Sequence, residues 1–224
     1  LSGLLKVFKM KKDEVMHNGV MLIAITFMLL LLSLDGSLSR VDGLVLVSFY
    51  IAYFFSLRRK SGLSIVKGKI RSIKGNNIKS LLKIVVGLVV LGQASHWVVE
   101  NGASIATELG VSQMIVGVIL IGLGTSLPEL VVSISALIKG ANGLSVGNLI
   151  GSNLIDIAIA LGGSAMIGGW KIERSVATFD LAYLLFTSVI VVLFLLTKES
   201  LERKESFLIF SLYLVYISLK GLGF

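Results

Sequence analysis

Seven apolar runs dominate the chain and limit most strongly what it can fold into. An α-helix needs about 20 predominantly apolar residues to cross the hydrocarbon core of a bilayer. Most of the runs are near that length, and 55% of the 224 residues are hydrophobic against 15% charged. We therefore predict an all-α polytopic membrane protein that has the lipid bilayer as its partner. The runs are 15–34, 41–57, 81–99, 111–138, 144–168, 176–197 and 207–219.

Basic residues gather between the second and third runs. From Arg58 to Lys83 there are nine Lys or Arg and no acid. In a soluble chain this density would indicate nucleic-acid binding. Between two membrane spans it is typical of a cytoplasmic loop, because such loops carry an excess of Lys and Arg. We predict that 58–80 is a cytoplasmic loop, that nucleic acid is no partner, and that the protein is a multi-pass protein of the cell membrane.

Two segments of the chain resemble one another at an offset of 163 residues (205 − 42). At this offset 42–53 lines up with 205–216, and the spans 15–34 and 176–197 correspond. The superimposed pairs are Ser48 with Ser211, Tyr50 with Tyr213 and Tyr53 with Tyr216.

The repeat predicts the domain organisation. Residues 1–57 would be the tail of a first repeat, with two spans, and 81–224 a second repeat with five. The counterpart of 81–163 would precede residue 1, so the chain is expected to lack the rest of its first repeat. Because five is an odd number, the two repeats of a ten-span protein would be inverted in the membrane, as in many secondary transporters.

A single acid, Glu129, lies deep within the fourth run. It ends the sequence G-T-S-L-P-E at 124–129, and the run from 111 to 138 holds no other charge. A carboxylate at the bilayer centre costs roughly 2.5–3.5 kcal/mol on insertion scales and by default marks a functional site. Pro128, the only proline of the chain, cannot donate a backbone hydrogen bond, so we expect a broken helix beside the acid. The Thr125 and Ser126 side chains lie within one helical turn of Glu129 and are expected to share its face.

The fifth run contains a second polar cluster, G-N-L-I-G-S-N-L-I-D at 147–156. Asn148, Ser152 and Asp156 are spaced by four residues, which predicts a polar stripe along one face of an apolar helix. Polar side chains often join helices in membranes, and for Asn148, Asn153 and Ser133 this reading is as good as a functional one.

The two acids, in contrast, require a positive partner. Between Lys83 and Lys171 the only Lys or Arg is Lys139, at the end of a span. The partner of Glu129 and Asp156 is therefore a proton, a transported cation or a group outside the chain, and intramembrane acids usually mark ion pathways. Oxygen ligands suit sodium and calcium. Calcium takes about six to eight oxygens, more than this cluster supplies, and an inverted second copy would add the remainder.

Together, G-T-S-L-P-E at 124–129 and G-N-L-I-G-S-N-L-I-D at 147–156 resemble the second alpha-repeat of the sodium/calcium exchanger family, in the calcium:cation antiporter superfamily. The strong part of the resemblance covers 81–163, with the ion-binding alpha-repeat at 111–163. It implies a ten-span prokaryotic fold, exchange of sodium for calcium by alternating access, and 81–99 as the gating helix. No cofactor or enzymatic activity is implied, since calcium and sodium are the transported ions.

The resemblance also implies roles for six residues. Glu129 would be shared between calcium and sodium sites, and Asp156 would line the central site. Hydroxyl or carbonyl oxygen would come from Thr125, Ser126 and Ser152, and a backbone carbonyl from Gly122. Three glycines before the acid are expected to let a neighbouring helix approach closely: Gly117, Gly122 and Gly124.

Three alternatives remain beside sodium/calcium exchange. One is a proton-coupled or potassium-dependent cation exchanger, one is a fragment without transport activity, and the third, an intramembrane enzyme, lacks any catalytic motif in the chain. Two further polar groups are expected to be structural. His96 and Glu100 would form a hydrogen bond at a span end, and Asp180 would pair with Arg174 or reach the interface.

Overall fold

The computed structural model describes residues 8–9, 12–60, 77–111, 116, 122–198, 200–201 and 203–222. These residues are mostly helical and confirm the predicted all-α polytopic membrane fold. They form two compact units, one made of Leu1–Tyr53 and Glu129–Phe224, the other of Phe54–Pro128. The helical segments that are long and apolar enough to span a membrane are Val15–Leu32, Arg40–Leu57, Lys79–Glu108, Asn142–Gly168 and Val176–Thr197.

Two of the expected spans differ from the prediction. The described part of the run 111–138 is interrupted by a turn at Ser126, and the longer helix in that part is α8 (Leu127–Ile138). The run 207–219 is helical as predicted and lies within α12 (Arg203–Gly221). Because α12 carries charged residues in its first and last turns, it is not among the segments apolar enough to span a membrane. In the basic loop, 61–76 fall outside the described residues, while α3 (Arg40–Lys60) and α5 (Asn77–Glu108) extend into its two ends.

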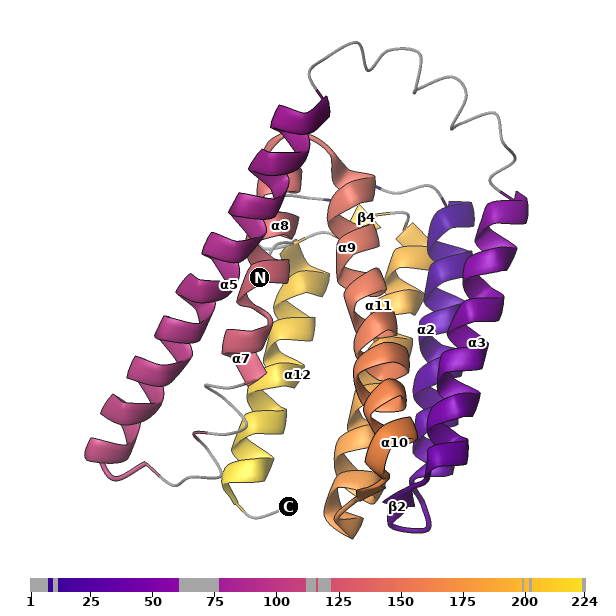
Figure 1. The fold of residues 1–224 in the computed structure, drawn as a ribbon, viewed down its shortest axis with the longest axis vertical. Helices are drawn as coiled ribbons and strands as arrows, with labels where there is room; N and C mark the ends of the chain where they lie inside the picture. Colours follow the sequence, from indigo (N-terminus) through magenta and orange to yellow (C-terminus); the bar gives the residue numbers. More distant parts are fainter. Residues whose placement is uncertain are drawn as a thin grey trace. The chain divides into compact units, whose positions relative to one another are not determined.

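The core of the larger unit forms around α2 (Lys12–Leu32), which packs along α11 (Leu181–Lys198) and against α9 (Asn142–Ile155). Figure 1 shows α2 and α11 side by side. Ile25 and Leu29 of α2 are buried, as are Val192 and Leu195 of α11. These two helices are also counterparts in the predicted repeat, so related helices meet in the core.

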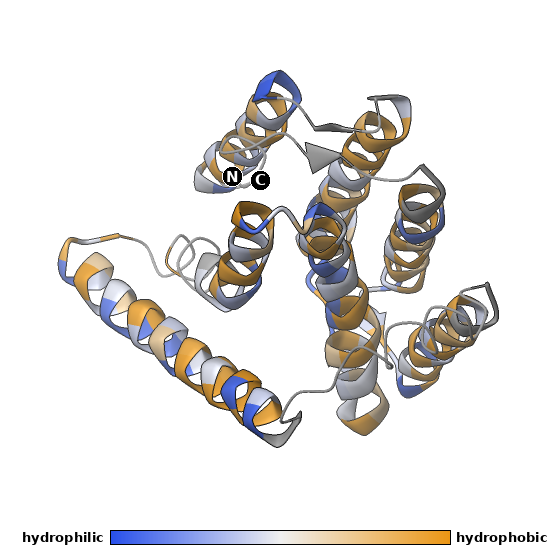
Figure 2. Cartoon of the chain, turned by 90° about the horizontal axis from the view of Figure 1, so that it is seen from above, coloured by the Kyte–Doolittle hydropathy of each residue, from blue (hydrophilic) through white to orange (hydrophobic). Residues whose placement is uncertain are grey.

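Many large apolar side chains point away from the protein. Leu81 and Val89 of α5 are 62% and 65% exposed, and Figure 2 shows apolar residues around most of the helical surface. A helix that is apolar all round is typical of a membrane span, where lipid covers the outward side chains.

Local sequence determines where several helices begin and end. The Ser39 N–H donates to Asp42 Oδ2 at 2.8 Å and the Asp42 N–H donates to Ser39 Oγ at 3.2 Å, a reciprocal capping pair at the start of α3. Gly140 follows α8 and Gly169 follows α10 (Gly162–Gly168), with φ of 74° and 67°. That left-handed conformation ends a helix and favours glycine.

Two very short strand pairs follow the offset of the predicted repeat. β2 (Ser37–Leu38) pairs with β3 (Trp170–Lys171), and β1 (Phe8–Lys9) pairs with β4 (Ser200–Leu201), both antiparallel. An offset of 163 residues carries β2 onto β4, and an offset of 162 carries β1 onto β3. The registers agree as well, because Phe8 faces Leu201 as Trp170 faces Leu38. β2 and β4 lie at opposite ends of the helices (Figure 1), which is the relation expected of inverted repeats.

The tyrosines that first indicated the repeat make related contacts. The Tyr53 hydroxyl donates to Asn18 Oδ1 at 2.9 Å, and the Tyr53 ring lies 5.5 Å from that of His17. The Tyr216 hydroxyl donates to Asp180 Oδ1 at 3.1 Å, and Asp180 is the counterpart of His17 at the offset of 163. Each tyrosine therefore joins a late helix of its repeat to the start of the preceding one.

We expect Gly43→Ala to destabilise the protein, because α3 passes very close to α10 at this residue. A Cβ at Gly43 would overlap the Gly162 carbonyl oxygen and lie 2.7 Å from the Met166 backbone nitrogen. Backbone atoms in packed helices move only at a cost, and overpacking of this kind typically costs about 1–3 kcal/mol. Thermal unfolding of the purified protein in detergent measures the loss.

Gly87→Ala is the matched control. Gly87 lies in the interior of α5, and a Cβ there would meet no atom of the described residues within 4 Å. Since alanine favours a helix interior by about 1 kcal/mol over glycine, this variant should unfold at the same temperature or higher. Equal unfolding temperatures for Gly43→Ala and the unchanged protein would contradict the close approach of α3 and α10.

Candidate cation site

The helix break predicted beside Pro128 is present. α7 (Gly122–Thr125) ends one residue before a turn at Ser126, and α8 begins at Leu127. Pro128 thus occupies the first turn of α8, where its missing N–H breaks no helical hydrogen bond. Thr125 and Ser126 thus lie outside the helix that carries Glu129, and their sharing of one face with Glu129 stays a prediction.

Glu129, in the first turn of α8, is half-buried, and its Oε2 atom is buried without a hydrogen-bond partner within the described parts of the chain. A buried carboxylate oxygen with no donor is unfavourable, because desolvation is not compensated. Its charge needs either a proton or a cation.

Asp156 lies at the point where α9 passes into η2 (Asp156–Leu161), a π-helical segment. Single π-helical turns occur frequently at functional sites in proteins. The Asp156 side chain is exposed. Asn148 of α9 hydrogen-bonds to the Glu129 backbone of α8, so the two acids on which the sequence prediction depends lie on helices that contact one another.

Basic residues do not neutralise this pair in the part of the chain that the structure describes. The ion pairs found there join His96 to Glu100 and Lys220 to Asp180, and Lys139 is exposed at the end of α8. Nor do three or more His, Cys, Asp or Glu side chains converge among the described residues. Two carboxylates with neutral oxygens nearby suit a hard cation that is held by few charges and can leave again.

Two hydroxyls of the predicted set turn their protons towards their own helices. Thr125 Oγ1 donates to the Gly122 carbonyl at 3.1 Å, and Ser152 Oγ donates to the Leu149 carbonyl at 3.2 Å. A hydroxyl has one proton and two lone pairs, so each oxygen keeps lone pairs for a cation. Ser126 is exposed in the turn. Gly122, Thr125 and Ser126 belong to the smaller unit, and joint coordination of an ion by all six residues stays a prediction.

The glycines before the acid differ in what surrounds them. A Cβ at Gly124 would overlap the Val99 side chain of α5, as expected for a close helix approach, whereas a Cβ at Gly122 would meet no described residue within 4 Å. The packing role expected of Gly122 stays a prediction. Gly117 lies outside the described residues.

The structure assigns structural contacts to several other polar groups. Asn148 joins α9 to α8, donating from Nδ2 to the Glu129 carbonyl at 3.1 Å and to Ser133 Oγ at 3.0 Å. Asn153 donates to the Leu149 carbonyl of its own helix, the one hydrogen bond of its side chain among the described residues. Sequence reasoning could identify Asn148 as a helix-joining residue, yet its contact with the acid-bearing turn had no sequence signal.

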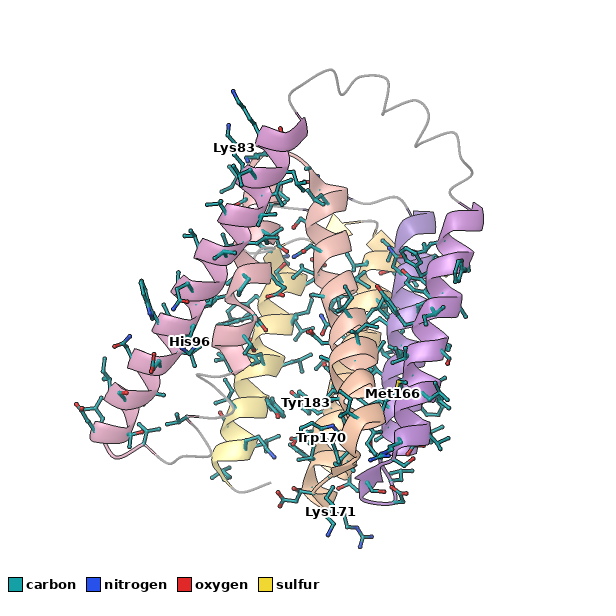
Figure 3. The ribbon with its side chains drawn as sticks, viewed as in Figure 1. Lys83, His96, Met166, Trp170, Lys171 and Tyr183 are labelled. Atoms are coloured by element: carbon teal, nitrogen blue, oxygen red, sulfur yellow. The ribbon has the colours of Figure 1, made fainter. Side chains whose placement is uncertain are left out.

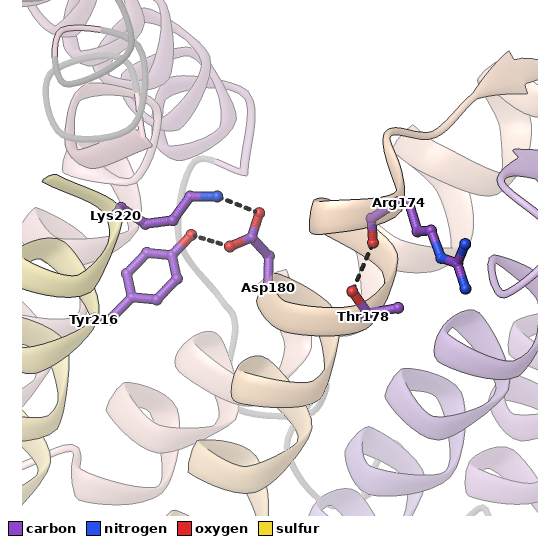
Figure 4. A network of polar contacts seen from close by, with 5 residues as sticks. All are labelled: Arg174, Thr178, Asp180, Tyr216 and Lys220. Atoms are coloured by element: carbon purple, nitrogen blue, oxygen red, sulfur yellow. Dashed lines mark hydrogen bonds and ion pairs between the residues drawn. The ribbon is translucent and has the colours of Figure 1, made fainter. Parts of the chain in front are cut away.

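Of the two span-end predictions, the one for His96 and Glu100 holds as a contact at ion-pair distance rather than as a hydrogen bond, and the pairing of Asp180 with Arg174 is wrong. His96 Nε2 lies 3.6 Å from Glu100 Oε2 on the exposed surface of α5, and Figure 3 shows His96 on that helix. Asp180 does not pair with Arg174. It accepts hydrogen bonds from Lys220 Nζ and the Tyr216 hydroxyl, both at 3.1 Å, while the Arg174 carbonyl accepts from Thr178 (Figure 4).

Comparison with known proteins finds a family match over the part of the chain that contains both motifs. The family model described as sodium/calcium exchanger protein matches residues 79–221. The chain belongs to this family. Exchanger family membership makes it a multi-pass membrane protein of a transporter class, as the helices long enough to span a membrane also indicate.

Individual relatives cover different parts of the chain. The sodium/calcium exchanger MaX1 of Methanosarcina acetivorans is 36% identical over 115 residues, 51% of this chain and 33% of its own length. The uncharacterized membrane protein MJ0091 of Methanocaldococcus jannaschii is 32% identical over 86% of this chain and 61% of its own length. The Escherichia coli inner membrane protein YrbG is 27% identical over 85% of this chain and 61% of its own length. This exchanger-family chain thus spans about three-fifths of the two relatives that match most of it.

The fold agrees with a solved exchanger. A structure of the sodium-calcium exchanger NCX_Mj, soaked with sodium and calcium, superimposes with a TM-score of 0.76 and 28% identity, covering 97% of this chain and 69% of that chain. The exchanger fold predicted from the two motifs is therefore confirmed.

Proposed function

We propose that the protein is an antiporter that exchanges sodium for calcium across the membrane. The observation that carries the proposal is the pair Glu129 and Asp156, two acids on contacting apolar helices without a basic partner among the described residues. Intramembrane acids of this kind mark ion pathways, and the family membership supports sodium and calcium as the ions.

In the proposed mechanism the same oxygens bind either calcium or sodium. Glu129 and Asp156 supply the charge, Thr125, Ser126 and Ser152 supply neutral oxygen, and Gly122 offers its carbonyl. Since the ions are substrates, transport requires no cofactor. Only a site filled by one ion type or the other lets the α5 gating helix move, which gives alternating access to the two sides of the membrane.

The complete transporter is proposed to contain a first repeat that supplies the inverted counterpart of this site, in a ten-span protein. Two observations support the proposal. The two strand pairs follow the repeat offset at opposite ends of the helices (Figure 1), and the chain covers 69% of the solved exchanger. A second copy would complete the six to eight oxygens that calcium typically takes.

Potassium-dependent exchange is the second candidate. The sodium/potassium/calcium exchanger 2 of Gallus gallus is 28% identical over 131 residues, 55% of this chain. That protein's name includes potassium as a third ion. The functional test therefore compares calcium uptake with and without potassium.

The functional test uses the complete gene product in membrane vesicles loaded with sodium. We expect calcium uptake when external sodium is replaced by choline, and no uptake when both sides hold equal sodium, because only a sodium gradient supplies the driving force. A proton gradient without a sodium gradient should drive no uptake. Radioactive calcium measures each condition.

Each alternative predicts a different result of this experiment. Uptake that requires potassium identifies a potassium-dependent exchanger, and uptake that follows the proton gradient identifies proton coupling. Expression of residues 1–224 alone, measured in the same vesicles, tests whether this part of the sequence transports by itself.

A further inference from the structure

Asn148 connects the two helices that carry the acids. Its Nδ2 atom donates one hydrogen bond to the backbone carbonyl of Glu129 at 3.1 Å and another to Ser133 Oγ at 3.0 Å. Ser133 is fully buried and donates in turn to the Ser145 carbonyl at 3.3 Å. The hydrogen-bond chain thus leaves α9, crosses to α8 and returns to α9.

The direction of each hydrogen bond in this chain is determined. A carbonyl oxygen only accepts, so the atom of Asn148 that faces the Glu129 carbonyl must be the amide nitrogen. Both of its protons are used, one on each partner. Ser133 accepts from Asn148, which leaves its own proton for Ser145. No side chain that lacks two donors can replace Asn148 in this arrangement.

The position of Asn148 relates this arrangement to the ion site. Asp156 lies eight residues farther along the same continuous helical segment, on the same polar stripe. A bond from Asn148 to the Glu129 backbone therefore fixes how far the first turn of α8 can slide along α9. Sliding would change the separation of the Glu129 and Asp156 carboxylates.

We propose that Asn148, braced by Ser133, is a positioning residue that holds Glu129 in register with Asp156 and so sets the affinity for calcium. The inference rests on the proposed function of the two acids as cation ligands. Asn148 itself touches no ion in this proposal. Partners that orient metal ligands typically change metal affinity by about 10- to 100-fold when they are removed.

The decisive experiment compares Asn148→Leu with Asn153→Leu in the sodium-loaded vesicles. Both variants remove an amide from α9 and neither adds charge. Within the described parts of the chain, however, Asn153 donates to Leu149 of its own helix and joins no second helix. We expect the KM for calcium to rise at least about tenfold in Asn148→Leu, with the maximal rate per inserted molecule reduced less. Asn153→Leu should stay within about twofold of the unchanged protein, because the contact between helices remains.

Ser133→Ala provides a second, milder variant that keeps the bond from Asn148 to Glu129. We expect its KM for calcium to rise by a factor of about three, which corresponds to roughly 0.6 kcal/mol of calcium-binding free energy. Ser133→Ala should add nothing when it is combined with Asn148→Leu, since residues that act through one contact are not additive. A merely structural role for Asn148 would lower the amount of inserted protein and leave the KM of the remainder unchanged.

Two outcomes overturn the inference. The first is normal sodium-driven uptake by the unchanged protein together with an unchanged KM for calcium in Asn148→Leu. If Asn148→Leu does not insert into the membrane, an unchanged KM in Ser133→Ala has the same meaning. In either case the positioning role is wrong while the proposed function stands. If the unchanged protein shows no sodium-driven calcium uptake, the proposed function fails and this inference fails with it.

Discussion

Replacing Glu129 by glutamine in the complete protein is expected to abolish sodium-driven calcium uptake. The substitution keeps the size and shape of the side chain and removes its charge. The buried Oε2 atom has no partner among the described residues, so in the proposed mechanism the cation itself compensates that charge. Removing one member of a buried charge pair typically costs about 3–5 kcal/mol, which corresponds to a loss of calcium affinity on the order of a hundredfold to a thousandfold.

The experiment needs a control for the loss of an acid as such. Glu100→Gln removes a carboxylate of the same type from α5, where the side chain is 65% exposed, and uptake should remain near the level of the unchanged protein. Both variants are measured per molecule inserted in the vesicle membrane. Normal uptake by Glu129→Gln at the usual calcium concentration would remove Glu129 from the ion site.

The sequence was sufficient to predict the helical membrane fold and the pair of acids. Length and apolarity alone determine that the runs form helices, since a backbone in lipid must satisfy its own hydrogen bonds. The missing N–H of Pro128 predicts a break whatever surrounds it. The unpaired state of Glu129 followed from counting charges, because basic side chains are missing from these runs. Each of these predictions depends on composition or on covalent structure rather than on packing.

Predictions of which residue contacts which were less successful. Arg174 is six residues from Asp180, and nearness in sequence favoured that pair. The carboxylate is instead paired with Lys220, 40 residues away, because α12 brings that side chain to the end of η3 (Val176–Asp180). Likewise, the spacing of four residues placed Asn148 on the right face of α9, but the turn of α8 that it contacts depends on how the two helices pack. Sequence periodicity contains no such information.

The Asp180–Lys220 pair leads to the second large prediction, a loss of stability in Asp180→Asn. The two side chains are 16% and 10% exposed, and Lys220 Nζ also lies 5.9 Å from the centre of the Phe179 ring. Asparagine can still accept the Tyr216 hydrogen bond shown in Figure 4, so the variant removes chiefly the negative charge. A buried ammonium group without its partner typically costs about 3–5 kcal/mol, and the unfolding temperature in detergent should fall by roughly 10 °C.

A double variant separates the cost of an unpaired charge from the value of the pair. Asp180→Asn combined with Lys220→Met removes both charges and keeps similar side-chain volumes. Because an ion pair out of water gains little over a neutral pair of the same shape, the double variant should unfold close to the temperature of the unchanged protein. The exposed pair His96 and Glu100, 3.6 Å apart on α5, provides the matched comparison, and Glu100→Gln should change the stability by less than about 1 kcal/mol. If the double variant is no more stable than Asp180→Asn, the charge of Lys220 is not the cause of the loss, and Asp180 stabilises the end of η3 through its hydrogen bond to Tyr216 instead.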